Sequence, residues 1–130
     1  MKLYHITSRE AWLDAARRGA YVAPSLAIEG FIHCSTAAQL YPVARRFYRG
    51  QNDLVLLLID TDRLRAELRW EQAPASDDLD EEAVFPHVYG PIDMSAIVGT
   101  SDFDPDELGE SGMPLMARED RAPTARGAAG

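Results

Sequence analysis

The chain has 130 residues, a single cysteine and a formal net charge of −8, from 13 Lys and Arg against 21 Asp and Glu. Its length suits one domain, its longest apolar run is far below the ~18–20 residues that span a bilayer, and its start lacks a signal-peptide core, so we expect a cytoplasmic protein without a membrane segment. Residues 73–130 carry 13 acidic and 3 basic residues, which argues against an extended nucleic-acid surface but still allows a local basic pocket for a small anion.

The first thirty residues predict a strand, a helix and a connection. Residues 3–7 form the strand, with successive side chains on opposite faces. Thr7 has Glu10 three residues later, the spacing of a capping box, so we expect a helix that starts after Thr7 and ends at Gly19. The stretch 20–30 contains proline and glycine, which favour a connection and a turn.

The next twenty residues repeat this pattern. Residues 31–35 are expected to form a short strand. Thr36 and Gln39 again have capping-box spacing, so a second helix should follow and stop at Gly50. Pro42 either distorts this helix or sets its true first turn.

The middle of the chain contains the most apolar strand candidate. Residues 54–59 are consecutive apolar residues, as in a central strand buried on both faces, although a short buried helix also fits this run. Residues 68–71 predict a further strand. Residues 73–82 combine Pro and Ser with acidic residues, which indicates a solvated loop.

The last part of the chain predicts a strand at a sheet edge and then a tail. Pro86 and Pro91 in "VFPHVYGPI" confine this strand to an edge or an end, because proline cannot donate to the ladder. A helical turn and a strand are expected over residues 93–103. Residues 109–130 lose all periodicity, so we predict a disordered tail after one domain formed by residues 1–108.

Each of the three histidines lies in a short apolar segment typical of a strand: "LYHIT", "FIHCS" and "FPHVYG". By the two-residue period of a strand, His33 shares a face with Phe31 and Ser35. Ile32 and Cys34 point the other way, so one face could belong to the core and the other to a cleft. The same alternation groups these residues on the histidine faces of the other two segments: Leu3 with His5, and Phe85 with His87 and Tyr89.

Four interpretations of these histidines stay open. Each imidazole can be a hydrogen-bonded core group, and three imidazoles with an open position also suit catalytic zinc, although no HxH or HxxxH pair is present. A nucleophilic pair of Cys34 with His33 is disfavoured, because adjacent strand residues face opposite ways, and Cys34 is expected to be a small buried hydrophobe. The fourth is a ligand cleft, in which imidazoles bind the hydroxyls or phosphates of a ribose-containing ligand.

Two features favour an anion in such a cleft. Ser35 and Thr36 lead into a helix N-terminus, where free N–H groups attract phosphate, although plain helix capping also explains both residues. The segment "ARRFYRG" supplies Arg45, Arg46 and Arg49 as candidate phosphate contacts. The alternative for these arginines is a solvated helix end, where cations complement the helix dipole.

The motifs "YHIT", "GFIHCS", "RFYRG", "DLVLLLID", "RWE" and "FPHVYGPI" occur in this order and resemble the small, mostly bacterial domain-of-unknown-function family 952. The resemblance covers residues 1 to about 100. That family is similar to the ADP-ribosyltransferase fold, to which the RNA 2′-phosphotransferases also belong. The resemblance implies an α+β fold with a split, mainly antiparallel sheet, two helices in the N-terminal half, and a cleft that binds NAD.

The resemblance also implies roles for individual residues. In that superfamily a histidine on the first core strand contacts a ribose of NAD, and His5 matches it by position. The second motif, on a strand that leads into a helix, is matched by His33 or Ser35, which would line the nicotinamide-ribose pocket. Many of these transferases use a late glutamate, where this chain has His87 and Tyr89. The 2′-phosphotransferase branch works without that glutamate.

Glu71 in "RWE" is a further possible carboxylate, although a solvated strand end also explains it. Arg46 and Arg49 are expected to contact the pyrophosphate of NAD or a 2′-phosphate acceptor. We therefore expect a protein that binds NAD or another ADP-ribose-containing nucleotide and transfers ADP-ribose or a 2′-phosphate, with His33 and His87 bonding the reacting sugar or moving a proton. The alternative is a non-catalytic module that keeps the pocket and senses a nucleotide or a partner.

Overall fold

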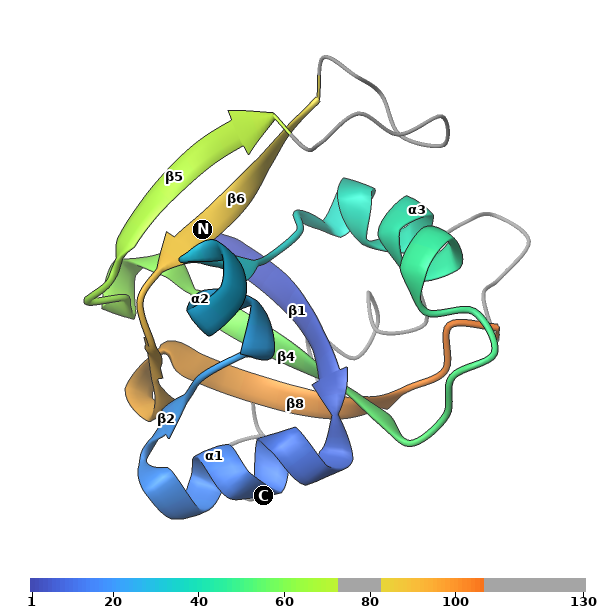
Figure 1. The fold of residues 1–130 in the computed structure, drawn as a ribbon, viewed down its shortest axis with the longest axis horizontal. Helices are drawn as coiled ribbons and strands as arrows, with labels where there is room; N and C mark the ends of the chain where they lie inside the picture. Colours follow the sequence, from blue (N-terminus) through green and yellow to red (C-terminus); the bar gives the residue numbers. More distant parts are fainter. Residues whose placement is uncertain (73–82, 107–130) are drawn as a thin grey trace.

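The computed structural model describes residues 1–72 and 83–106; the predicted acidic loop (73–82) and tail (109–130) lie outside them. The described residues form an α+β fold with mainly antiparallel sheets, as predicted (Figure 1). The elements, in chain order, are β1 (Lys2–Ser8), α1 (Arg9–Arg18), β2 (Ala20–Tyr21), α2 (Pro24–Glu29), β3 (Ile32–His33), α3 (Ala37–Phe47), β4 (Leu54–Asp60), η1 (Thr61–Arg63), β5 (Glu67–Gln72), β6 (Val84–Tyr89), β7 (Ile92–Asp93), η2 (Met94–Ala96) and β8 (Ile97–Phe103).

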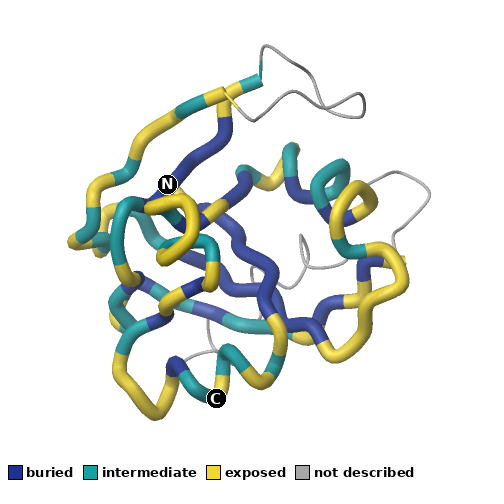
Figure 2. The backbone as a smooth tube through the Cα atoms, viewed as in Figure 1, coloured by how far each residue is buried: buried dark blue, intermediate teal, exposed yellow. Residues whose placement is uncertain are grey.

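Strand β4 is the centre of the first sheet, in the order β1-β4-β8 with both pairs antiparallel. Its apolar residues from Leu54 to Ile59 are all buried, which confirms the predicted central strand. Alternate side chains of β4 enter two cores, one shared with α1 and β2 and the other with α3. Figure 2 shows the backbone of β4 coloured as buried. Burial on both faces explains why this segment is apolar at every position.

Strand β6 is the middle strand of the sheet with the order β3-β6-β5, so of the two predicted positions, an edge or an end, the edge is wrong. Pro91 follows the end of β6 at Tyr89, and only Pro86 lies within the strand. Cys34 N–H donates to the Pro86 carbonyl at 3.0 Å, but proline has no N–H for the return bond. The ladder weakens there, and β3 ends at His33, shorter than the predicted strand over residues 31–35. Pro86 therefore lies in a central strand at the point where its neighbour stops.

The two three-stranded sheets are joined through Tyr4 and Ser35. The N–H of each residue donates to the carbonyl of the other, and both distances are 2.8 Å. This bridge brings the chain after β3 beside β1, which carries His5. Since His33 lies opposite His87 in the β3–β6 register, the backbone alone brings the three histidine segments together.

Helix α3 begins as predicted. Thr36 is its N-cap and forms a capping box with Gln39 in both directions. The helix starts before Pro42 and continues through it, so Pro42 does not set the first turn. It ends at Phe47 rather than at Gly50, which leaves Arg49 outside the helix.

The two helices before it differ from the prediction. Helix α1 is capped by Ser8, whose hydroxyl accepts from Ala11 N–H at 3.0 Å, so the predicted cap at Thr7 is one residue early. The stretch 20–30, predicted as a connection, contains β2 and α2. Pro24 occupies the first turn of α2, where its missing N–H costs nothing. No helix in the described part of the chain is long and apolar enough to cross a membrane.

Candidate functional site

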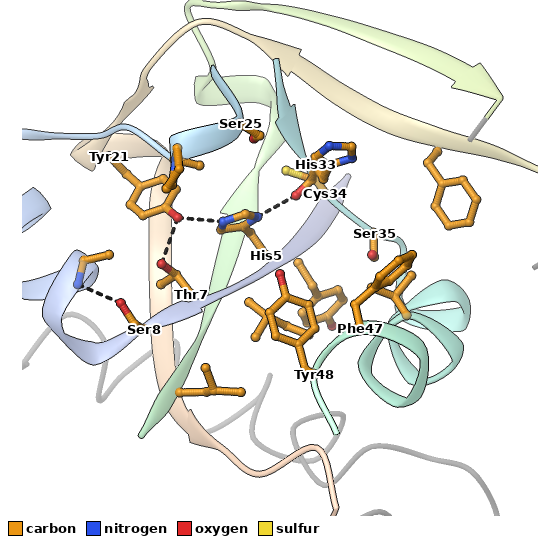
Figure 3. Close-up of a pocket in the computed structure, with 18 of the residues that line it drawn as sticks. His5, Thr7, Ser8, Tyr21, Ser25, His33, Cys34, Ser35, Phe47 and Tyr48 are labelled. Carbon is orange, nitrogen blue, oxygen red and sulfur yellow. Dashed lines mark hydrogen bonds between the residues drawn. The ribbon is translucent and has the colours of Figure 1, made fainter. Parts of the chain in front are cut away.

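A cavity of about 670 Å³ is lined by β1, α2, the end of β3 and α3 (Figure 3). His5, His33 and His87 all line it, although they come from three strands that are far apart in the sequence. Ligand pockets in proteins are typically about 300–1,000 Å³. The structure therefore brings all three predicted histidines to one hollow that is large enough for an organic ligand.

His5 is the most completely bonded of the three. Its side chain is buried, with 7% of the residue exposed, and its Nδ1 donates to the His33 carbonyl at 2.5 Å. Its Nε2 lies 2.7 Å from the Tyr21 hydroxyl. Burial lowers the pKa of His5 from 6.5 to about 4, so the ring is neutral near pH 7.

A chain of hydrogen bonds runs from His5 through Tyr21 to Thr7 (Figure 3). A carbonyl only accepts, so the single proton of the neutral His5 ring is on Nδ1 and Nε2 accepts from Tyr21. The Tyr21 oxygen lies 2.8 Å from the Thr7 hydroxyl, which is then its donor. Tyr21 is 1% exposed, and burial raises its pKa to about 12, so it stays a neutral donor.

His33 lies at the exposed side of the cavity. Its side chain is 45% exposed, and its Nε2 lies 2.5 Å from a carboxylate oxygen of Glu29, which is 41% exposed. Its ring also packs edge-on against Phe31, with centroids 4.8 Å apart. Because water screens this pair, His33 is held less firmly than His5 but is open to a ligand.

His87 forms a third environment: it is buried, and among the described residues its side-chain hydrogen bond is on one nitrogen only. Its side chain is 4% exposed and stacks on Phe31, with ring centroids 4.0 Å apart and planes inclined by 16°. Its Nδ1 donates to Glu71 at 2.8 Å, and the Tyr89 hydroxyl donates to the same oxygen at 2.6 Å. These two donors, first Tyr89 and then His87, lower the pKa of Glu71.

The remaining predicted residues divide into two groups. Ser35 and Arg46 line the cavity, and the Ser35 hydroxyl has no hydrogen-bond partner among the described residues although it is not sealed from solvent. Thr36, Arg49 and Tyr89 do not line it. Thr36 caps α3, and Arg49 lies 4.0 Å from Asp106.

Cys34 is buried, as predicted, with 3% of its surface exposed, but it also lines the cavity, whereas the strand alternation predicts it on the face opposite to the cleft. Burial raises the pKa of its thiol to about 12, so it is not a thiolate near pH 7. In residues 1–72 and 83–106, no group of three or more His, Cys, Asp or Glu side chains is arranged to hold a metal ion.

Three residues of this site have roles that sequence reasoning missed: Tyr21, Glu29 and Glu71. Tyr21 lies in the stretch predicted as a connection, and nothing local marks its hydroxyl as the partner of His5. Glu29 precedes His33 by four residues, a spacing that indicates a pair only if both lie on one helix. The sequence indicates Glu71 as a possible carboxylate but not as the partner of His87, because that bond depends on the β5–β6 register.

The fold and the cavity define a small α+β protein with a histidine-lined pocket, and comparison with known proteins gives its family. The family model described as "Protein of unknown function (DUF952)" matches residues 6–100, so the chain belongs to this family. The search of curated proteins gives no match.

Three solved structures of one bacterial protein are similar to this chain. The crystal structure of CC0527 from Caulobacter crescentus is 31% identical, with a TM-score of 0.73 over 92% of this chain and 97% of that one. A crystal structure of its double mutant is 30% identical to this chain, with a TM-score of 0.72 and the same coverage of both chains. Its solution NMR structure is 31% identical, with a TM-score of 0.67 over 91% of this chain and 95% of that one.

Proposed function

We propose that the cavity binds NAD or a related ADP-ribose-containing nucleotide, and that the chain transfers ADP-ribose from it on a fold of the ADP-ribosyltransferase type. The observation that carries this proposal is the convergence of His5, His33 and His87 on one cavity of about 670 Å³. Imidazoles suit ribose hydroxyls because a neutral ring offers one donor and one acceptor.

The residues along the cavity fit the parts of such a nucleotide. Ser35 offers a hydroxyl to a ribose, and the rings of Phe47 and Phe85 can pack on a nicotinamide or adenine ring. Arg46 lines the cavity and is the phosphate contact in this proposal. Arg49 lies outside the cavity, so the proposal assigns the pyrophosphate to Arg46 alone.

When bound, NAD supplies an ADP-ribosyl group through its bond to nicotinamide. In this proposal His5 does not bond the sugar itself. Tyr21 and the His33 carbonyl use both of its nitrogens, and these bonds hold the His33 segment in place beside the ribose. Glu29 is the one carboxylate that lines the cavity in the described part of the chain. Its place beside His33 suits positive charge that develops on the ribose carbon.

A non-catalytic sensor is the second candidate, and the exposure of Glu29 favours it. A carboxylate that is 41% exposed and already bonded to His33 stabilises a developing cation less than a buried one does. Such a cavity would still recognise a nucleotide by its hydroxyls and rings.

Nicotinamide release and calorimetry test the proposal. We expect NAD to bind, Arg46→Ala to weaken binding about tenfold, the typical cost of losing a charged hydrogen bond, and Arg49→Ala to change it less than about twofold. The two variants lose the same charge, so the pair separates cavity contact from overall charge. Release of nicotinamide supports transfer, and binding without release supports the sensor. If neither NAD nor ADP-ribose binds at millimolar concentration, both candidates fail.

A further inference from the structure

His87 is held more rigidly than a wall residue of the cavity needs to be. Its ring stacks on Phe31 at 4.0 Å and meets His33 edge-on at 5.3 Å. With 3% of the residue exposed, His87 has no room to change rotamer without displacing these neighbours. The position and the plane of the imidazole are therefore fixed by packing.

The Nδ1 edge of this ring is fixed by a carboxylate. Arg69 lies opposite His87 in the β5–β6 register, and Glu71 is two residues further along β5, at the diagonal position that a long side chain can reach. A carboxylate only accepts, so Nδ1 carries the proton of the bond to Glu71. Tyr89 donates to the same oxygen, and Arg69 lies over the Tyr89 ring at 4.5 Å.

The other nitrogen of His87, Nε2, differs from Nδ1 in its hydrogen bonding. Nε2 has no hydrogen-bond partner among the described residues. It is also not fully buried, because it is absent from the fully buried side-chain atoms that lack a partner there. His87 lines the cavity, and an unbonded nitrogen that is not fully buried is its polar edge for a molecule there. In the neutral ring this nitrogen has a free lone pair.

The three histidines thus differ in what they offer to a ligand. His5 has both nitrogens bonded inside the protein, and His33 is exposed and paired with Glu29. His87 alone combines a fixed ring, a carboxylate on one nitrogen and an accessible lone pair on the other. A carboxylate–imidazole pair of this kind is the arrangement of a general base.

We propose that His87 is the general base of the cavity and that Glu71 is its positioning residue. The inference rests on the proposed function and names its acceptor as a hydroxyl, with water as the simplest case. The acceptor oxygen forms a bond to the ribose carbon, and its proton passes to His87 Nε2. The bond from that carbon to nicotinamide breaks, and its electron pair leaves with nicotinamide.

Glu71 suits this role for two reasons. Its bond to Nδ1 selects the ring form in which Nε2 can accept a proton. Its negative charge then stabilises the imidazolium that forms, because opposite charges in hydrogen-bond contact attract strongly. The donation from Tyr89 and His87 lowers the pKa of Glu71, which keeps the carboxylate ionised.

The first experiment examines the imidazole of His87 without any ligand. Nitrogen-15 NMR of the wild-type protein above the pH at which its histidines protonate should show the proton of His87 on Nδ1 and none on Nε2. Glu71→Ala removes the acceptor, so a form with the proton on Nε2 should appear. Glu71→Gln keeps a carbonyl acceptor and should keep the wild-type form. A wild-type ring protonated on Nε2, or a ring unchanged in Glu71→Ala, would overturn the inference.

The second experiment measures nicotinamide release from NAD with water as acceptor. Glu71→Ala removes both the ring form and the negative charge, so it should lower kcat by up to the factor of about 10²–10⁴ that a general base contributes. Glu71→Gln keeps the ring form and should lower kcat less, and neither variant should change KM much. Glu67→Gln is the matched control, because it removes a carboxylate from the same strand. Glu67 is bonded to Arg69 and does not line the cavity. Equal losses in Glu67→Gln and Glu71→Gln, or a loss confined to KM, would contradict the proposal.

The two experiments separate the inference from the function on which it rests. The NMR measurement needs no NAD, so it decides whether Glu71 positions His87 in any case. The expected ring form without nicotinamide release would refute the proposed transfer and leave Glu71 as the positioning residue of His87. Release without the expected ring form would refute the positioning role alone.

Discussion

Two walls of the cavity hold a buried histidine in different ways. On the β1 wall, His5 donates to a carbonyl and accepts from Tyr21, so both nitrogens are satisfied inside the protein. On the β6 wall, His87 donates to Glu71, and its second nitrogen has no hydrogen-bond partner in the part of the chain that the structure describes. The comparison shows that burial alone does not distinguish a structural histidine from one that is available to bind or react with a ligand. The number of nitrogens that the protein already uses does.

The largest expected effect is on the β1 wall. His5→Ala removes the partner of the His33 carbonyl and one of the two partners of the Tyr21 hydroxyl, and it opens a space in the wall. We expect the free energy of unfolding to fall by about 3 kcal/mol, the order found for core truncations that also strand a polar group. Urea unfolding measures this loss. His33→Ala is the control, and its exposed ring should cost less than about 1 kcal/mol; equal losses would contradict the comparison.

A second prediction concerns acid. The pKa of His5 is about 4 in the folded protein and about 6.5 in the unfolded chain, so between these values the unfolded chain holds more protons and stability falls as the pH falls. Linkage gives a loss of about 2 kcal/mol at pH 5 relative to pH 8. Unfolding midpoints across this range measure it, and His5→Asn should lack this component. Parallel curves for the two proteins would show that His5 is not held neutral.

The hydroxyl of Tyr21 should have a smaller effect. Tyr21→Phe removes the donor to His5 Nε2 and the acceptor for Thr7, and we expect a loss of about 1–2 kcal/mol because two buried hydrogen bonds are lost. Tyr48→Phe is the matched control, because the Tyr48 hydroxyl also lines the cavity but has no hydrogen-bond partner among the described residues. Thermal unfolding of the two variants compares them directly. A larger loss of stability in Tyr48→Phe than in Tyr21→Phe would contradict this prediction.

Much of the scaffold could be predicted because its signals are local. The apolar run of β4, the capping box of Thr36 with Gln39, and the alternation that buries Ile32 and Cys34 all depend on residues within a few positions of one another. Such patterns follow from the periods of helix and strand. They also placed His33 on the face opposite to the core.

The bonds that distinguish the histidines could not be predicted, because they depend on register. Tyr21 lies on a two-residue strand that pairs with β7, about seventy residues later, and no periodicity marks so short a strand. Glu71 meets His87 only because β5 and β6 pair as they do, and no local pattern within either strand fixes that register. The position of Pro86 could not be predicted for the same reason, because a proline fits in this central strand only where the neighbouring β3 ends.

The smallest expected effect belongs to the pair of Glu29 with His33. Its 2.5 Å distance is as short as the His5 bond, yet both side chains are more than two-fifths exposed, so water competes for each partner in the folded protein as it does in the unfolded chain. A double-mutant cycle with Glu29→Gln and His33→Ala should give a coupling energy below about 0.5 kcal/mol. A coupling above about 1 kcal/mol would mean that the open side of the cavity is held as firmly as its β1 wall. The contrast between bonded and available imidazoles would then have to be drawn from His87 alone.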